Sequence, residues 1–234
     1  MRELNNDEIK PLANAIAAGN VVLVQELLDN YGDVDAHMTY GRTALHHAAG
    51  CDSIEVARML INIGADANAI GTPLGVTPLQ LACISGSLST AGMLLDAGVN
   101  VDIKSRTGRT ALHYALYQPD GNRSGREILG LILRYSPDVN AADEGGVTPA
   151  DMAIDYAELS DLILLLDRGA DPNAKINGAS RLHRLAASGL PIEYFEKLIE
   201  AGADVDSLDH DNCRPLDVAL KNGRNDLSSI FSRT

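Results

Sequence analysis

One phrase recurs along the chain at a nearly constant step, and this recurrence limits the possible folds more than any other feature. One copy reads Thr43-Ala44-Leu45-His46, and the other copies begin at Lys10, Thr77, Thr110, Thr148, Ser180 and Arg214. Successive starts are separated by 33, 34, 33, 38, 32 and 34 residues. A fixed period of about 20–50 residues is typical of chains that stack one supersecondary unit on the next. The sequence therefore predicts a stack of seven units.

A second phrase closes each unit, for example Gly64-Ala65-Asp66-Ala67-Asn68. Further copies begin at Gly98, Gly169 and Gly202, and weaker ones at Gly32 and Pro137. Glycine ends a helix readily because it adopts left-handed backbone angles, and Asp and Asn favour tight turns. The second phrase therefore predicts the end of a helix followed by a projecting, hairpin-like finger.

The segment between the two phrases has the pattern of two helices. Thr or Ser at the start of the first phrase caps a helix N-terminus, and proline suits the first helical position. A short, Ala-rich first helix follows, such as residues 45–50 or 79–85. The second helix is longer, with apolar residues at helical spacing, as in 54–61. Each unit is thus predicted to be helix–turn–helix plus finger.

The TPLHxA-like opening, the GADVN-like close and the 33-residue step resemble ankyrin repeats over about residues 8–231. The resemblance implies an all-α solenoid of stacked helix pairs, with a concave surface formed by fingers and first helices. Neighbouring units would supply the stability, because one unit cannot bury its apolar face alone. We expect one domain, 1–234, with the first and last repeats acting as caps. The predicted repeats are 6–37, 38–70, 71–104, 105–142, 143–175, 176–208 and 209–234.

Charge and hydropathy bear on the compartment and on the class of partner. The net charge is −13, and an acidic surface repels nucleic-acid phosphate, so we expect no nucleic-acid partner. No apolar run is long enough to span a membrane, and the start of the chain lacks the pattern of a signal peptide. We expect a cytoplasmic monomer with no membrane partner, and secretion by a signal-independent route stays open.

The sequence carries no pattern that indicates catalysis, a cofactor or a metal site. Cys51, Cys83 and Cys213 lack metal-ligand spacing, and we expect buried structural thiols in a reducing compartment. The resemblance implies that His46, His113 and His183 form hydrogen bonds between neighbouring units. Hydrolase, phosphate-loop and dinucleotide-binding motifs are missing from the sequence, so we expect no enzyme.

Two segments depart from the repeat. The step of 38 residues places about five extra residues in the loop 118–125, which either tolerates surface drift or contacts a partner. The finger 69–75 is one residue longer and unusually apolar. Its Ile70 and Leu74 either anchor a partner or fold back onto a neighbouring finger.

Finger tips and first-helix ends are the places where the fold does not dictate the residue, so we expect a partner to bind there. Tyrosines at such sites resemble interface hot spots. Cations gather on the early fingers and carboxylates on the late ones, which indicates either solvated faces or complementarity to a partner of matching charge. The candidate partner-binding residues are Met38, Tyr40, Arg42, Ile70, Leu74, Lys104, Arg106, Arg109, Tyr117, Asp143, Glu144, Tyr156, Lys175, Ile176, Asp209 and His210.

Three functions are compatible with this pattern. The first is a non-catalytic module or scaffold that binds a protein on its concave finger and first-helix surface. The second is an inhibitor or immunity-type protein that masks a basic enzyme surface, which the net charge permits. The third is a structural spacer with no ligand in the groove.

Overall fold

In the computed structural model, residues 3–117, 124–156 and 158–231 are described, and these residues form two compact units, Met1–Asp138 and Val139–Thr234. Each unit repeats a helix pair followed by a finger, so the predicted all-α repeat fold is confirmed. The prediction of a single domain over 1–234, with its repeat boundaries, stays a prediction. Residues 118–123 of the predicted enlarged loop lie outside the described residues.

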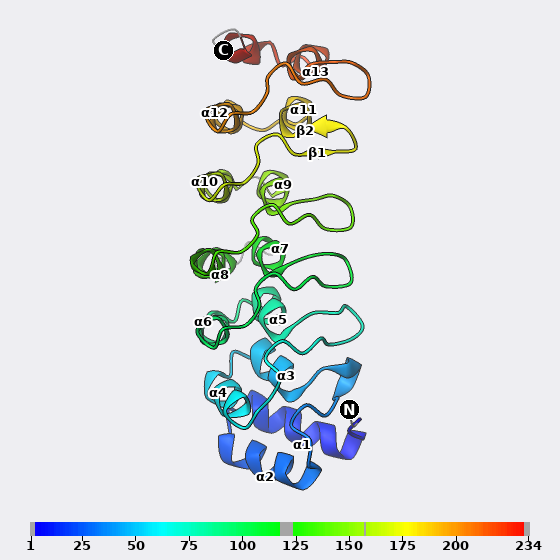
Figure 1. Ribbon diagram of the computed structural model, residues 1–234, viewed down its shortest axis with the longest axis vertical. Helices are drawn as coiled ribbons and strands as arrows, with labels where there is room; N and C mark the ends of the chain where they lie inside the picture. Colours follow the sequence, from blue (N-terminus) through cyan, green and yellow to red (C-terminus); the bar gives the residue numbers. More distant parts are fainter. Residues whose placement is uncertain (1–2, 118–123, 157, 232–234) are drawn as a thin grey trace. The chain divides into compact units, whose positions relative to one another are not determined.

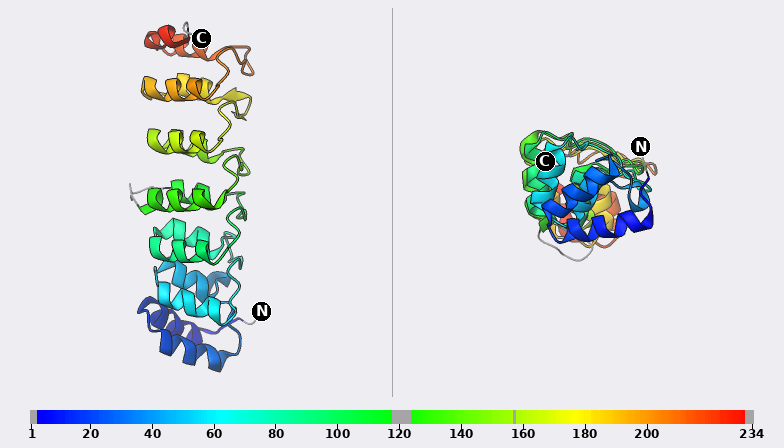
Figure 2. Two further views of the ribbon diagram at one scale, coloured as in Figure 1. Left: turned by 60° about the vertical axis from the view of Figure 1, so that its left-hand side comes forward. Right: turned by 90° about the horizontal axis from the view of Figure 1, so that it is seen from below.

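The first unit contains four helix pairs. The helices are α1 (Asn6–Ala17) and α2 (Val21–Tyr31), α3 (Ala44–Gly50) and α4 (Ile54–Asn62), α5 (Pro78–Ser85) and α6 (Leu88–Asp96), then α7 (Ala111–Leu116) and α8 (Ser124–Ile132), with short 3-10 turns η1 (Thr39–Gly41) and η2 (Leu133–Tyr135). Within this unit the second helices α4, α6 and α8 lie along one side and the fingers project from the other (Figures 1 and 2). First helices lie between them, where their small side chains allow close stacking.

The second unit continues the pattern with fewer repeats. Its helices are α9 (Pro149–Asp155), α10 (Leu159–Asp167), α11 (Arg181–Ala187), α12 (Ile192–Glu200) and α13 (Pro215–Lys221), followed by η3 (Asn225–Leu227) and α14 (Ser228–Phe231). One finger forms a two-stranded hairpin, β1 (Lys175–Ile176) paired antiparallel with β2 (Ala179–Ser180). Asn177 and Gly178 between the strands both have positive φ, as the tightest hairpin turns require.

The core of each unit is aliphatic and lies between the helix pairs. Leu45, Leu60 and Leu94 are fully buried in the first unit, and Leu162, Leu185 and Phe195 in the second. Small residues such as Ala48 and Ala82 are fully buried on the first helices, which lets neighbouring repeats pack closely. This pattern explains why the chain folds with two Phe and no Trp.

The cysteine prediction is correct for one residue and wrong for two. Cys83 is buried inside α5, and burial raises the pKa of its thiol to about 12. Cys51 is exposed because it follows the last residue of α3, and Cys213 is half-buried because it precedes α13. Both therefore lie at helix boundaries rather than in a helix core.

Candidate functional site: fingers and first-helix ends

The base of each finger is fixed by a ladder of Asp and Asn side chains that crosses from one repeat to the next. In each rung, a side-chain oxygen at the end of one closing phrase accepts a hydrogen bond from a backbone N–H in the next closing phrase. The donor–acceptor distances are 2.7–3.1 Å for Asp66 to Asp35, Asn100 to Asn68 and Asp138 to Asp102 in the first unit, and for Asp171 to Asn140 and Asp204 to Asn173 in the second. These residues are thus held by the fold and are not free to vary with a partner.

Asn and Asp are not equivalent in this ladder. The amides of Asn140 and Asn173 also donate to the carbonyl oxygens of Gly169 and Gly202, both at 3.0 Å. A carboxylate lacks that donor. At Asp35 partial burial raises the pKa of the carboxyl, against the hydrogen bond from Asp66, which lowers it.

First helices of neighbouring repeats are joined through the fourth residue of the opening phrase. His46 Nδ1 accepts from the backbone N–H of Thr43 at 3.2 Å, so Nε2 carries the proton and donates to the carbonyl of Val76 at 3.0 Å. Burial, together with a smaller effect of the positive Arg42 nearby, lowers the pKa of His46 to about 4. His183 makes the same bond to the carbonyl of Cys213 at 2.9 Å. The predicted role of these two histidines between repeats is confirmed by geometry.

Gln80 performs the same role without a titrating group. Its Oε1 accepts from the backbone N–H of Thr77 at 3.0 Å, and its amide donates to the carbonyls of Ile103 and Arg109 at 2.5 and 3.2 Å.

Asp151 breaks this pattern, because an acidic side chain cannot donate to the next repeat. Arg181 of the next repeat reaches back instead: its Nε lies 2.9 Å from Asp151 Oδ1, and one terminal nitrogen donates to Thr148 Oγ1 at 2.6 Å. A further terminal nitrogen of Arg181 donates to the carbonyl of Asp171. Arg184 adds a second contact to Asp151 Oδ1 at 2.8 Å. Arg181 and Asp151 are both buried, so this coupling is an ion pair removed from water.

Sequence reasoning missed this pair. The signal was present, because Arg181 replaces the Pro or Ala of the second position in the repeat that follows the one with Asp151. When neighbouring copies of the opening phrase each carry an unusual residue, as with Asp151 and Arg181, the two residues are candidates for contact with each other.

On the first unit, the predicted partner-binding residues divide into exposed and buried ones. Tyr40, Ile70 and Leu74 expose 68%, 57% and 49% of their surface, so all three side chains are accessible to a partner. Lys104 and Arg106 are exposed, and Arg42 and Arg109 are half-buried.

Met38 corrects the prediction, because it is 4% exposed. Its backbone N–H donates to the carbonyl of Arg42 at 2.7 Å, which closes the turn and places Met38 at its base rather than its tip. Met38 belongs to the core and is not available to a partner.

Three finger tips of the first unit, at residues 37–43, 69–76 and 103–109, are linked to one another by hydrogen bonds. Thr72 Oγ1 donates to the carbonyl of Tyr40 at 2.8 Å, and the backbone N–H of Arg106 donates to the carbonyl of Leu74 at 3.0 Å. Gly41 has a positive φ, and any Cβ there would collide with the Thr72 hydroxyl. The tips therefore form one continuous surface held by the backbone.

On the second unit, two predicted carboxylates are used by the fingers themselves. Asp143 Oδ1 accepts from the N–H groups of Gly145 and Val147 at 2.8 and 3.0 Å. Asp209 Oδ1 does the same for residues 211 and 213, both at 2.9 Å, and the Cys213 N–H chiefly lowers the pKa of the Asp209 carboxyl. These side chains shape the fingers first, whatever a partner contacts.

The remaining candidates of the second unit lie near the tips. Glu144 and His210 are exposed, with the His210 ring 3.3 Å from the exposed Asp211 carboxylate. Lys175 is exposed and donates to the carbonyl of Leu208 at 3.1 Å, whereas Ile176 is half-buried in the hairpin. Leu208 itself is 49% exposed. It was not among the predicted partner-binding residues, although its position in a finger could have identified it.

First-helix ends expose the aromatic residues expected there. Tyr117 directly follows α7 and Tyr156 directly follows α9, and both are exposed. Ile84, in the last turn of α5, is exposed in the same way. In each unit, helix ends thus offer a second set of apolar groups besides the finger tips.

The comparison with known sequences agrees with the geometry. A sequence model described as Ankyrin repeats (3 copies) matches residues 1–71 and 63–143. The chain belongs to the ankyrin-repeat family. Human Ankyrin repeat and SOCS box protein 16 is 31% identical over 224 residues, which cover 95% of this chain and 42% of that protein. Human B-cell lymphoma 3 protein is 31% identical over 225 residues, with 92% and 48% covered.

Solved ankyrin structures show the same arrangement. The ankyrin repeat domain of Bcl-3, described as a member of the IkappaB protein family, has a TM-score of 0.83 at 29% identity, with 96% of this chain and 98% of that chain covered. The human ASB11 ankyrin repeat domain has a TM-score of 0.70 at 24% identity and supports the fold alone. The chain spans less than half the length of the two curated ankyrin relatives.

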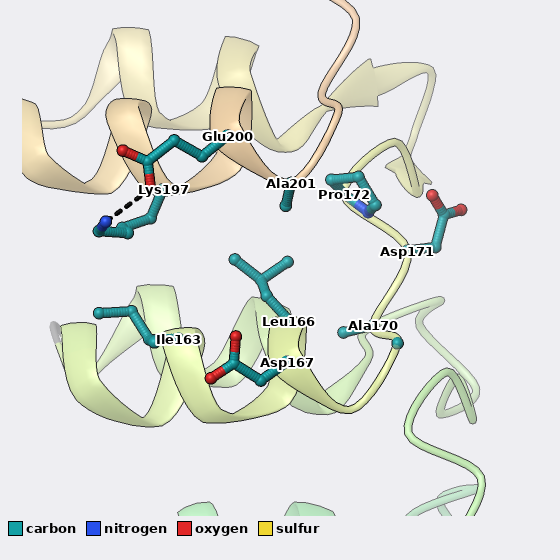
Figure 3. Close-up of a pocket in the computed structure, with 10 residues that line it drawn as sticks. Ile163, Leu166, Asp167, Ala170, Asp171, Pro172, Lys197, Glu200 and Ala201 are labelled. Carbon is teal, nitrogen blue, oxygen red and sulfur yellow. Dashed lines mark hydrogen bonds and ion pairs between the residues drawn. The ribbon is translucent and has the colours of Figure 1, made fainter.

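A hollow of about 570 Å³ lies between α10 and α12 of the second unit (Figure 3). None of the predicted partner-binding residues lines it. Ile163, Leu166 and Ala201 line its apolar part, and the ion pair between Lys197 and Glu200, with an N–O distance of 2.6 Å, lies at its edge.

Among the described residues, no group of three or more His, Cys, Asp or Glu side chains has an arrangement that could hold a metal ion. None of the described helices has the length and apolar character needed to cross a membrane.

Proposed function

We propose that this ankyrin-repeat chain holds a protein partner on its finger tips and first-helix ends, and that it carries out no catalysis of its own. One observation carries the proposal. Of the twelve large apolar side chains that the described residues expose, eight lie on this surface: Tyr40, Ile70, Leu74, Ile84, Tyr117, Tyr156, Leu208 and Leu220. The other four, Val22, Leu23, Ile63 and Tyr135, lie elsewhere, so the exposed apolar side chains are concentrated on this surface.

These side chains have the chemistry of interface anchors. Tyrosine offers a large contact area and a hydroxyl with few rotatable bonds, and a handful of such anchors supplies most of the affinity in typical interfaces. A stable interface covers about 800 Å² on each partner, which a row of several fingers can supply. The fixed finger bases reduce the ordering cost on binding, since the ladder is already formed in the free protein.

The carboxylates of the second unit favour a basic patch on the partner as a second candidate. Glu144, Asp209 and Asp211 lie on its fingers, and Glu144 and Asp211 are exposed. An inhibitor that masks a basic enzyme surface would bind through these carboxylates. A structural spacer would use neither the carboxylates nor the exposed apolar side chains. We place the activity in the cytoplasm, because the exposed Cys51 thiol would be prone to oxidation elsewhere.

The test compares capture of partners from native lysate by the wild-type chain and by a variant with Tyr40, Tyr117 and Tyr156 all changed to Ala. We expect the captured partner to bind the variant at least about thirtyfold more weakly, because even one hot-spot truncation costs about 2 kcal/mol or more. The matched control changes three exposed apolar residues away from the surface, Val22, Leu23 and Ile63, to Ala. Equal loss in both variants, or no loss in either, would refute the proposed surface and leave the spacer function.

A further inference from the structure

Cations are concentrated at the finger tips of the first unit, against the charge of the whole chain. We define the tip surface as residues 37–43, 69–76 and 103–109. It carries Arg42, Lys104, Arg106 and Arg109 and contains no Asp or Glu, although the chain has a net charge of −13. The nearest carboxylates along the chain, such as Asp35, Asp66 and Asp102, lie at the finger bases, where each accepts a backbone hydrogen bond.

Apolar groups are interleaved with these cations. The Thr72–Tyr40 hydrogen bond joins the first two tips, and the Arg106–Leu74 backbone bond joins the second and third. Arg42 also packs beside Gly71, where an added Cβ would lie 3.3 Å from its Cγ. Exposed Tyr40, Ile70 and Leu74 therefore belong to the same linked tips as Arg42 and Arg106.

Arg106, the exposed arginine of this surface, is available to an outside anion. Neither Arg42 nor Arg106 forms an ion pair with a carboxylate among the described residues, and the buried Nε of Arg42 has no acceptor there. Exposed ion pairs are individually weak, so recognition by this surface requires several charges together with apolar contact.

The surface is also rigid. Gly75 has a positive φ, and a Cβ at this position would lie 2.8 Å from Arg106 Cγ and 3.0 Å from its backbone nitrogen, so the second and third tips touch through their backbones. A preformed surface of this kind loses little conformational entropy when a flexible segment binds.

We propose that the tip surface binds an acidic peptide segment in which carboxylates are interspersed with aliphatic or aromatic side chains. The carboxylates would face Arg42, Lys104, Arg106 and Arg109, while the apolar side chains would cover Ile70, Leu74 and Tyr40. This inference rests on the proposed function and names the chemistry of its partner. A nucleic acid fits less well, because bases stack on aromatic faces and the aliphatic side chains of Ile70 and Leu74 offer none.

The test is a selection of random peptides displayed on phage, with the full chain as the target. Peptides that bind the wild type are then measured against Arg106→Glu and against Ile70→Ser/Leu74→Ser. The controls are Arg58→Glu, an exposed charge reversal on α4, and Ile63→Ser, an exposed apolar change beyond α4. None of these substitutions removes a buried side chain, so the fold should be preserved in all four variants.

We expect the selected peptides to be enriched in Asp and Glu alternating with apolar residues. Arg106→Glu should weaken them by about three- to tenfold at low salt, because it removes one attraction and adds one repulsion, and less at high salt. The Ile70/Leu74 variant should weaken them by about tenfold or more. The two controls should change the affinity by less than about twofold.

Four outcomes would overturn the inference: no enrichment of acids, no recovered peptide, equal loss in the controls, or equal competition by a single-stranded oligonucleotide. Concentration-dependent self-association that Arg106→Glu abolishes would assign the surface to a second copy of the chain instead. Peptides that depend on Tyr117 or Tyr156 but not on Arg106 would overturn this inference while leaving the proposed function intact.

Discussion

His46 provides a direct test of how neighbouring repeats are coupled. It is fully buried in its neutral form, because its Nδ1 accepts from Thr43 and its Nε2 donates to Val76. Its pKa is about 4 in the folded protein and 6.5 in the unfolded chain. Between these values the unfolded chain binds a proton that the folded protein does not, so the stability falls as the pH is lowered from 6.5 to 4. Over this window the loss for His46 alone amounts to about 3 kcal/mol.

His46→Gln should remove this loss without breaking the coupling. Gln80 shows that glutamine makes both the capping bond and the bond to the next repeat. At pH 7.5 the variant should therefore lie within about 1 kcal/mol of the wild type. At pH 4.5 it should be the more stable protein by about 2–3 kcal/mol.

The measurement is urea unfolding followed by far-UV circular dichroism at several pH values between 7.5 and 4.5. Carboxylates titrate in the same range, but they do so equally in both proteins, so the difference between the two isolates the imidazole. The reciprocal change, Gln80→His, places a new imidazole at an equally buried position and should add a comparable acid sensitivity. If the pH profiles of wild type and His46→Gln are parallel, the buried neutral histidine is not the source of acid sensitivity.

Two further predictions concern the second unit. Asp151→Ala should lower the free energy of unfolding, measured in urea, by about 3–5 kcal/mol, because it removes the buried counterion of Arg181. The double variant Asp151→His/Arg181→Ala should return to within about 1 kcal/mol of the wild type. If the two variants are equally unstable, the buried-charge explanation is wrong. Asn173→Ala should cost about 1–2 kcal/mol by losing both its bonds, to Asp204 and to Gly202. Asn173→Asp keeps the acceptor and loses the donor, so its thermal unfolding midpoint should lie between those of Asn173→Ala and the wild type. A midpoint as low as that of Asn173→Ala would show that the hydrogen bond to Asp204 contributes nothing.

The repeat phrases were sufficient to predict the helix pairs, because each phrase position has a local role. Thr77 caps the N-terminus of α5 and Pro78 takes its first position, so the predicted helix 79–85 agrees with α5 to within one residue. The exposed tips at Tyr40, Ile70 and Leu74 were predictable for the same reason: a finger that the repeat does not bury points to solvent.

Other features depend on contacts that no local pattern contains. Met38 lies in a finger but points inward, because a hydrogen bond to Arg42 closes the turn above it. Arg181 occupies a position where the phrase expects a small residue, and its burial is understandable only from Asp151 in the preceding repeat. The ladder likewise joins a side chain to a backbone N–H about one repeat away, so a single copy of the phrase does not reveal it.

The net charge of −13 is therefore a poor guide to the partner of this chain. Asp66, Asp171 and Asp204 each accept a hydrogen bond from the backbone two residues further along, so these carboxylates recur because the finger base requires them. The tip surface of the first unit contains no such carboxylate, and its charge has the opposite sign. A partner would meet the tips before the bases. Arg106→Glu and Arg58→Glu change the net charge equally, so a difference between them in peptide binding would show that local charge, not net charge, selects the ligand.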